Sequence, residues 1–279
     1  MDLKSQKNFY TYFMLIGFTI LLLLSYQSTE FDFFALFGKK SRRNIFFFVK
    51  GMFPPDTGTE FLKVVGMAIL ETISISIMGT LFGIVIALSL TFFATRTLTY
   101  SGILHEMEPN RFVSRSIWRL INILSRLLLN LFRAVPELVW ALIFILSVGI
   151  GPFPGVLALG VHTGGILGKL YSEFFEDVDS QPLEALLSMG TTKMQILLYG
   201  MLPQALPQFI SYTLYRWEVN IRAATILGYV GAGGIGQQIY INMNLTFYNK
   251  LMTLILVILL MVTLVDRLSA FIRRKLLTQ

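Results

Sequence analysis

Residues 251–265 read LMTLILVILLMVTLV, a run that contains no charged side chain. Asp266 and Arg267 follow it directly. A helix needs about 20 apolar residues to cross the hydrocarbon core of a bilayer, which is about 30 Å thick. The run and its neighbours therefore predict a membrane span over residues 250–271. The two charged side chains near its end would extend along the helix to reach the lipid interface.

The composition of the whole chain agrees with this reading. Of 279 residues, 54% are hydrophobic and only 14% are charged, and the mean hydropathy is +0.67. So little polar surface cannot enclose a water-soluble core of this size. The absence of cysteine excludes disulfides and thiolate-bound zinc, and two histidines, His105 and His162, offer little for another transition metal. The net charge of +7 comes from short stretches between apolar runs, which favours the cytoplasmic membrane face over nucleic-acid binding.

Further apolar runs of similar length predict six spans in all. They lie near residues 9–28, 66–93, 127–150, 154–175, 206–229 and 250–271. The first resembles a signal peptide, but no small-x-small cleavage site follows it in residues 25–30. We therefore expect it to be retained, and we expect an all-α membrane protein with six transmembrane helices.

Basic residues beside the spans predict that both termini are cytoplasmic. The supporting residues are Lys4, Lys7, Arg96, Arg111, Arg115, Arg119, Arg273, Arg274 and Lys275. A conflicting basic cluster lies in residues 31–53, which also carry eight phenylalanines. We interpret it as an amphipathic segment on the outer headgroups, with a re-entrant hairpin as the alternative. The predicted division is residues 1–60, the first span with this segment, and residues 61–279, a transmembrane domain with a cytoplasmic hairpin at 177–205.

The hairpin is predicted from the order of its signals. Glu184-Ala185-Leu186-Leu187-Ser188-Met189-Gly190 is followed, twelve and thirteen residues after the glycine, by Leu202-Pro203. A helix, a glycine break, a second helix and a proline stop make a compact helical pair. Such a pair could be ordinary loop packing.

The same spacing resembles the EAA loop by which permeases of ABC importers dock onto their ATPases. The resemblance implies that Glu184, Ala185 and Gly190 couple the permease to ATP hydrolysis. Two positions depart from the pattern: Leu186 stands at the third motif position, and Gly200 stands where isoleucine is common. Both the hinge glycine and the leading carboxylate are kept.

Four longer stretches resemble the phosphonate permease family, and together they cover most of residues 116–275. They are RAVPELVW at 133–140, HTGGILGKLY at 162–171, LPQALPQF with SYTLYRWE at 202–218, and GAGGIG at 231–236. The resemblance implies the type I ABC importer fold seen in methionine permeases. It also implies transport of phosphonate, phosphite or hypophosphite across the bacterial inner membrane by alternating access.

The resemblance further implies the partners. We expect a second permease copy, two ATPase subunits that carry ATP and magnesium, and a periplasmic or lipid-anchored solute-binding protein. No catalytic residue, cofactor or metal is expected in this chain itself, which would be a transport subunit and no enzyme.

The predicted fifth span carries unusual charges. Arg216, Glu218 and Arg222 cannot all face lipid, because an arginine at the bilayer centre costs roughly 2.5 to 3.5 kcal/mol. Glu218 and Arg222 stand four residues apart and can pair, whereas Arg216 shares its face with Asn220. One interpretation is a packing network that also includes Glu137. The other is a substrate path in which guanidinium groups offer paired donors to a passing oxyanion.

Other polar residues inside the predicted spans can be explained by local pairing or helix packing. We expect Arg133 to pair with Glu137 and Lys169 with Glu173, since each couple is four residues apart. His162 lies among small residues that permit close helix approach, so hydrogen bonding is favoured over proton transfer, and the residue stays a candidate for the substrate path.

The glycine-rich run at residues 228–236 invites a nucleotide-binding reading. It lacks the Gly-Lys-Ser/Thr ending and follows no predicted strand, so we exclude ATP binding by this segment. We interpret Gly231, Gly233 and Gly234 as a flexible turn at the outer end of the fifth span, where a gate could open.

Two alternatives stay open. An amino-acid permease of the methionine type would share the hairpin and the glycine-rich turn, although the three charges of the fifth span are not expected there. A membrane-embedded enzyme acting on lipid would need a nucleophile or a metal cluster, and the sequence has no cysteine, histidine pair or Asp-rich motif.

Overall fold

The protein is described by a computed structural model that covers residues 3–29, 32–101 and 112–277. His105 and Arg111 lie outside these described residues. Every regular element in the described part is helical. The chain divides into two compact units, Met1–Phe53 and Pro54–Gln279, and each is described by itself.

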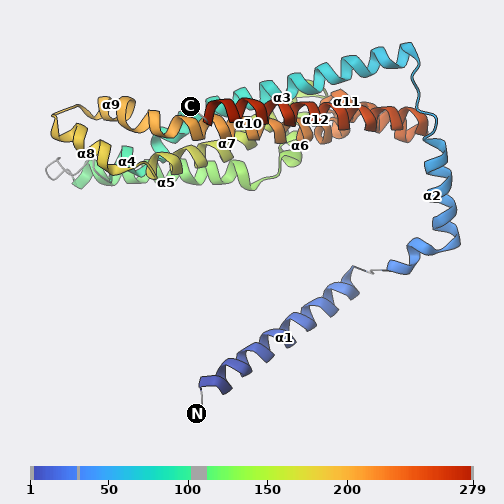
Figure 1. Cartoon of the computed structure of the whole chain (residues 1–279), viewed down its shortest axis with the longest axis horizontal. Coiled ribbons are helices and arrows are strands. Elements are labelled where there is room, and N and C mark those ends of the chain that lie inside the picture. Colours follow the sequence, from blue (N-terminus) through green and yellow to red (C-terminus); the bar gives the residue numbers. More distant parts are fainter. Residues whose placement is uncertain (1–2, 30–31, 102–111, 278–279) are drawn as a thin grey trace. The chain divides into compact units, whose positions relative to one another are not determined.

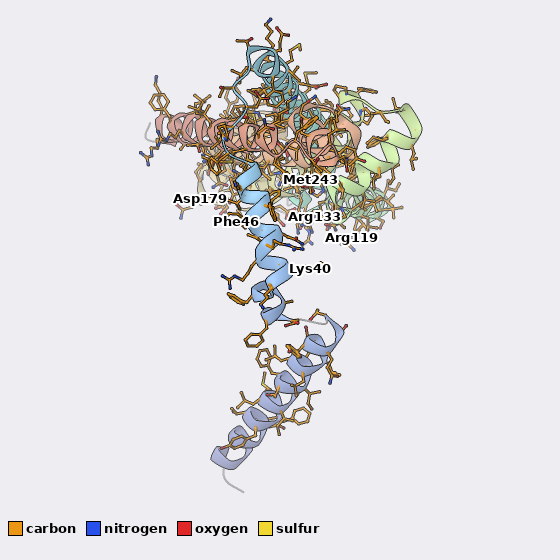
Figure 2. The ribbon with its side chains drawn as sticks, turned by 90° about the vertical axis from the view of Figure 1, so that its right-hand side faces the viewer. Lys40, Phe46, Arg119, Arg133, Asp179 and Met243 are labelled. Carbon is orange, nitrogen blue, oxygen red and sulfur yellow. The ribbon has the colours of Figure 1, made fainter. Side chains whose placement is uncertain are left out.

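The first unit consists of three helical elements. They are α1 (Leu3–Ser28), η1 (Phe33–Phe37) and α2 (Lys39–Gly51). Asp32 caps η1, since its carboxylate accepts hydrogen bonds from the backbone N–H groups of Phe34 at 2.9 Å and Ala35 at 3.1 Å. Helix α2 carries the basic cluster and buries no residue, and Figure 2 shows Lys40 and Phe46 projecting from it. The predicted amphipathic segment is therefore helical, and its place on the headgroups stays a prediction.

The second unit is a bundle of longer helices with short helical connections. Its elements are α3 (Thr59–Ala94), α4 (Arg96–Thr99), α5 (Phe112–Ala134), α6 (Glu137–Val148), α7 (Pro152–Glu176), α8 (Ser180–Ser188), α9 (Lys193–Gln195), η3 (Ile196–Met201), α10 (Leu202–Leu227), η4 (Gly228–Ala232), α11 (Gly234–Asn244) and α12 (Tyr248–Leu277). Figure 1 shows α3, α7, α10 and α12 running along the bundle, with α8 and α9 at one end and α6 and α11 toward the other.

Helices α3 and α7 form the centre of the bundle through small residues. A Cβ atom added to Gly164 would lie 2.7 Å from Ile86 Cγ2, and one added to Gly79 would lie 2.7 Å from Leu159 Cβ. On another side of α7, a Cβ on Gly165 would lie 2.8 Å from the Leu129 carbonyl oxygen of α5. Such spacing lets helix backbones approach closely. The prediction that the small residues beside His162 permit close packing is therefore confirmed.

The predicted third span, residues 127–150, is not one straight helix. Helix α5 ends at Ala134, α6 begins at Glu137, and the two axes differ by 91°. Pro136 is the cause, because it has no N–H to donate and it disfavours helical geometry at Val135. An apolar composition over residues 137–150 concealed this break.

The bend also affects the count of spans. Among the described residues, α1, α3 and α12 are each long and apolar enough to cross a bilayer, and the bent pair α5–α6 is a fourth candidate. Helices α7 and α10 have 25 and 26 residues but are not among the helices apolar enough to count as candidates. Six spans therefore stay a prediction.

Candidate functional site

The hairpin predicted at residues 177–205 forms as a helix pair, but the predicted stop at Pro203 is wrong, because the second helix continues through η3 into α10. Asp179 caps α8 by accepting a hydrogen bond from the Gln181 N–H at 3.1 Å. The chain reverses at Gly190, whose φ of +77° is a left-handed conformation that glycine adopts without strain. Thr192 and Gln195 then form a capping box at the start of α9. Local sequence signals thus set both ends of the turn.

The hairpin is fastened to the bundle by a shared core. Leu183 of α8 is buried, and a Cβ added to Gly200 would lie 2.6 Å from its Cδ2 atom. Glycine at this position therefore lets α8 lie directly against η3, which explains the departure from isoleucine. Leu183 belongs to the same buried cluster as Tyr171 of α7 and Phe209 of α10, whose rings stack with centroids 4.1 Å apart.

The outer surface of the hairpin is exposed and partly apolar. Glu184, Ala185 and Gly190 are all exposed. Large apolar side chains beside them are exposed as well, with Met189 at 76% and Tyr199 at 74% of their full areas. An exposed apolar group on a compact helical pair is typical of a protein contact surface. The geometry therefore leaves the predicted coupling residues accessible to a partner.

Four charges link α10 to α12. Arg222 lies 3.2 Å from Asp266 and 3.8 Å from Glu218, and Glu218 lies 3.1 Å from Arg273. The predicted Glu218–Arg222 contact is thus present, and two residues of α12 extend it. Two guanidinium groups and two carboxylates make the network neutral. Glu218 is its most buried member, with 12% of its side chain exposed.

Asn220 lies on a different face of α10 and is completely buried. Its Oδ1 accepts a hydrogen bond from the Thr163 hydroxyl at 3.1 Å, and its Nδ2 donates to Thr80 Oγ1 at 2.9 Å. The amide therefore joins α3, α7 and α10 at one point. Burial and full hydrogen bonding at this position serve helix packing.

His162 and Glu137 meet at the break between α5 and α6. His162 Nε2 lies 3.3 Å from a Glu137 carboxylate oxygen, and its Nδ1 lies 3.0 Å from the Val135 carbonyl oxygen. Trp140 Nε1 donates to the Phe132 carbonyl at 3.1 Å. The break at Pro136 leaves the Phe132 and Val135 carbonyl groups without a helical partner. Trp140 and His162 provide their hydrogen bonds instead.

The predicted Arg133–Glu137 pair is wrong. Pairing at four residues' spacing requires a continuous helix, and the helix is broken between these two positions. Arg133 instead donates through Nε to Asn130 Oδ1 at 3.0 Å. The predicted Lys169–Glu173 pair is present at 3.4 Å.

Arg216 is the least satisfied of the predicted path residues. It lies within electrostatic range of Glu137 and His162, yet its Nε is buried and has no hydrogen-bond partner among the described residues. A buried donor without a partner costs free energy unless something else contacts it. Arg216, Glu137 and His162 therefore form a polar group that is separate from the α10–α12 network.

The glycine-rich run forms a bend that leads into a further helix. Gly231, Gly233 and Gly234 all have positive φ angles, and residues 232–236 are buried. They lead into α11, a helix that the sequence reading did not predict. A Cβ on Gly233 would lie 2.6 Å from the Glu71 carboxylate. The run forms a packed bend in the structure, and its opening as a gate stays a prediction.

Glu71 of α3 was missed from the sequence. Its carboxylate accepts a hydrogen bond from the Gly234 N–H at 2.8 Å, and Thr72 Oγ1 accepts one from the Ile235 N–H at 2.9 Å. Both groups satisfy the N-terminus of α11, where the helix dipole favours a negative charge. An acidic residue inside a predicted span was the signal that could have revealed this contact.

Comparison with known proteins identifies the family. Residues 102–278 match the model of the binding-protein-dependent transport system inner membrane component. The chain belongs to this family. It is therefore a multi-pass transport subunit of the membrane and not an enzyme, and systems of this family combine a permease with an ATPase and a solute-binding protein.

Individual relatives are permeases too, in agreement with the family match. The phosphite transport system permease protein PtxC of Stutzerimonas stutzeri is 41% identical over 206 residues, which cover 74% of this chain and 69% of the relative. The putative phosphite transport system permease protein HtxC of the same organism is 38% identical over 226 residues, covering 81% and 73%.

A solved structure shows the fold. A chain of the inward-facing MetNI methionine ABC transporter matches with a TM-score of 0.63, at 20% identity, over 79% of this chain and 99% of that one. The predicted type I importer fold is thus confirmed.

Proposed function

We propose that this chain is the permease of an ABC importer for a phosphorus oxyanion: phosphonate, phosphite or hypophosphite. The observation that carries the proposal is the 41% identity, over most of both chains, to a permease named for phosphite transport. The methionine alternative has weaker support, because the methionine transporter structure is only 20% identical. Membership of a transport family also argues against the lipid-modifying enzyme.

We further propose the coupling role of the hairpin. Glu184, Ala185 and Gly190 are exposed beside Met189 and Tyr199, so a groove on an ATPase subunit could receive this surface. Leu183 ties the same hairpin to the core of α7 and α10. ATP-driven closure of the two ATPase subunits would then move the helices of two permease copies, opening the path outward and later inward. Both termini would be cytoplasmic, with residues 1–60 an N-terminal segment and residues 61–279 the transport domain.

For the substrate path, we propose that Arg216 is the principal contact among Arg216, Glu218, Asn220, Arg222, Glu137 and His162. Its guanidinium retains donor capacity, whereas Arg222 is placed between Glu218 and Asp266. Glu137 near Arg216 would weaken the positive field and so help release of the anion. Asn220, Glu218 and Arg222 would support the path by holding α10 in place.

We propose that Gly231, Gly233 and Gly234 contribute to an outer gate. Their positive φ angles and the bond from Glu71 make a defined bend, whose movement would require the Glu71–Gly234 hydrogen bond to break. Replacing Glu71 with Gln keeps the shape but weakens this charge-assisted bond.

The test is uptake by the complete importer in proteoliposomes. Labelled phosphite should accumulate with ATP and with the cognate binding protein, and unlabelled phosphonate, hypophosphite, phosphate and methionine should be compared as competitors. Competition by methionine alone, with none by any phosphorus oxyanion, would overturn the substrate assignment. Replacing Glu184 with Ala should lower uptake and uncouple ATP hydrolysis, whereas replacing the exposed Gln181 with Ala should change neither.

A further inference from the structure

A pocket of about 200 Å³ lies between α5 and α7, apart from the polar group around Arg216. Its polar lining comes from Arg126, Asn130, Arg133, Lys169, Ser172 and Glu173. Three of these are cations and one is a carboxylate, so the lining carries two net positive charges. Such an excess in a partly enclosed space attracts anions.

The arginines belong to a stripe along α5. Arg119, Arg126 and Arg133 are spaced by seven residues, about two helical turns, and so share one face. Arg119 and Arg133 are labelled in Figure 2. An adjoining face carries Leu120, Leu124, Leu127 and Leu131, each more than half exposed. The leucines are thus exposed beside the arginine stripe, in which Arg126 is partly buried and Arg119 and Arg133 are exposed.

The three cations of the pocket differ in how they are already paired. Arg126 contacts Glu176 and donates through Nε to the Ala94 carbonyl at 2.8 Å. Lys169 lies 3.4 Å from Glu173. Arg133 has only the neutral Asn130 as its hydrogen-bond partner and forms no ion pair with any described carboxylate. Arg133 is consequently the cation that can take a new anion at the smallest cost.

The surrounding donors suit a small tetrahedral anion. The terminal nitrogens of a guanidinium form a planar fork that matches two oxygens of a phosphorus oxyanion. The amide of Asn130 on α5 and the ammonium group of Lys169 on α7 also line the pocket and add donors from two helices. We propose that this pocket binds a phosphorus oxyanion through Arg133, with Lys169 and Asn130 as supporting contacts.

The position of the pocket suggests when it is used. Its α7 residues lie in the last two turns of that helix, directly before the hairpin. An anion leaving a central path would meet this site next to the ATPase side, so the pocket serves as an exit site. This inference rests on the proposed transport of phosphorus oxyanions and adds a second location along the route.

Direct binding to the permease tests the inference. The full chain is placed in nanodiscs of phosphatidylcholine, and phosphite is titrated while the broadening of its ³¹P resonance is measured. Arg133→Gln should weaken binding by about tenfold or more, because a charge-assisted hydrogen bond is lost. Arg119→Gln is the matched control, since it removes the same charge from the same stripe outside the pocket. Lys169→Gln is a second variant and should weaken binding less.

A second experiment distinguishes binding of a free anion from binding of a lipid headgroup. The titration is repeated with phosphatidylglycerol in the nanodisc. Unchanged phosphite binding, still sensitive to Arg133→Gln, supports the exit site. Phosphite binding that is equal in all variants, or an Arg133 effect seen only on bound phosphatidylglycerol, overturns it.

Uptake by the complete importer distinguishes the two proposals. Failure of the unmodified importer to take up any phosphorus oxyanion overturns the proposed function. Normal uptake by the unmodified importer, together with identical phosphite binding by Arg133→Gln and Arg119→Gln, overturns only the exit site.

Discussion

Two faces of helix α10 treat their charges in opposite ways. On the face toward α12, Glu218 and Arg222 are paired with Arg273 and Asp266, and the four charges cancel. On the face toward α6 and α7, Arg216 keeps a buried Nε without a hydrogen-bond partner, near Glu137 and His162. Charges within two turns of one helix can thus serve packing on one side and remain available for a ligand on the other.

The difference shows that a charged residue inside a membrane helix is not by itself evidence of a transport path. A charge is costly in lipid, and its cost is offset either by a partner or by water and substrate. Arg222 has direct ion pairs, whereas Arg216 forms none with the described residues and has only the longer-range attraction of Glu137. Variants that remove one charge at a time can therefore break or sharpen this comparison.

The largest effect is expected for Glu218→Gln. It leaves Arg222 and Arg273 facing each other without the carboxylate between them, which should lower the free energy of unfolding by about 3 kcal/mol. Unfolding in mixed micelles, followed by circular dichroism, measures this. Glu60→Gln is the control, because Glu60 forms only an exposed pair with Lys63. Equal stability of the two variants would show that the network does not hold α12.

The next effect is expected for Asn220→Leu. The substitution removes two buried hydrogen bonds and leaves the Thr163 hydroxyl without its acceptor, at a cost of about 2 kcal/mol in the free energy of unfolding. The exposed Asn244, replaced in the same way, should cost less than about 0.5 kcal/mol. A stable Asn220→Leu variant with defective uptake would instead assign the amide to the substrate path.

For Arg216→Gln we expect a smaller free-energy change, and we expect it in transport and not in stability. Because its Nε has no partner to lose, stability should change by less than about 1 kcal/mol. Uptake of phosphite should fall by about tenfold, which corresponds to about 1.4 kcal/mol. Arg222→Gln, measured in the same proteoliposomes, should retain most uptake. A reversed order of the two variants would exchange the roles of the two faces.

The smallest effect is expected for the Arg222–Asp266 pair. Both side chains are about two-fifths exposed, so a double-mutant cycle with Arg222→Gln and Asp266→Asn should give a coupling energy of about 0.5 kcal/mol. A coupling energy above about 2 kcal/mol would mean that this end of the network is shielded in the membrane, and would move Arg222 further from any role in transport.

Local signals predicted one part of this molecule well. The hairpin was predicted from the Gly190 break, and the caps that the structure adds, Asp179 and the Thr192–Gln195 capping box, are equally local. The Glu218–Arg222 and Lys169–Glu173 contacts follow from helical spacing alone. Such features depend on short-range geometry, which a sequence displays directly.

Contacts between residues far apart in the sequence could not be predicted from local signals. Asp266 and Arg273 were interpreted as interface charges of the last span, because nothing in the sequence places them beside α10. Pro136 was visible, but its apolar surroundings favoured a continuous span, and the Arg133–Glu137 prediction failed with it. Helix α11 and its contact with Glu71 link segments 163 residues apart and required the fold.

The burial of Leu183 against Gly200 has a mechanical consequence. Because one compact cluster spans α8, α7 and α10, tilting the hairpin alone would separate stacked side chains and open a void, which is costly in a packed interior. A force applied at Met189 or Tyr199 is therefore transmitted directly to α7 and α10, because the hairpin and these helices move as one rigid body.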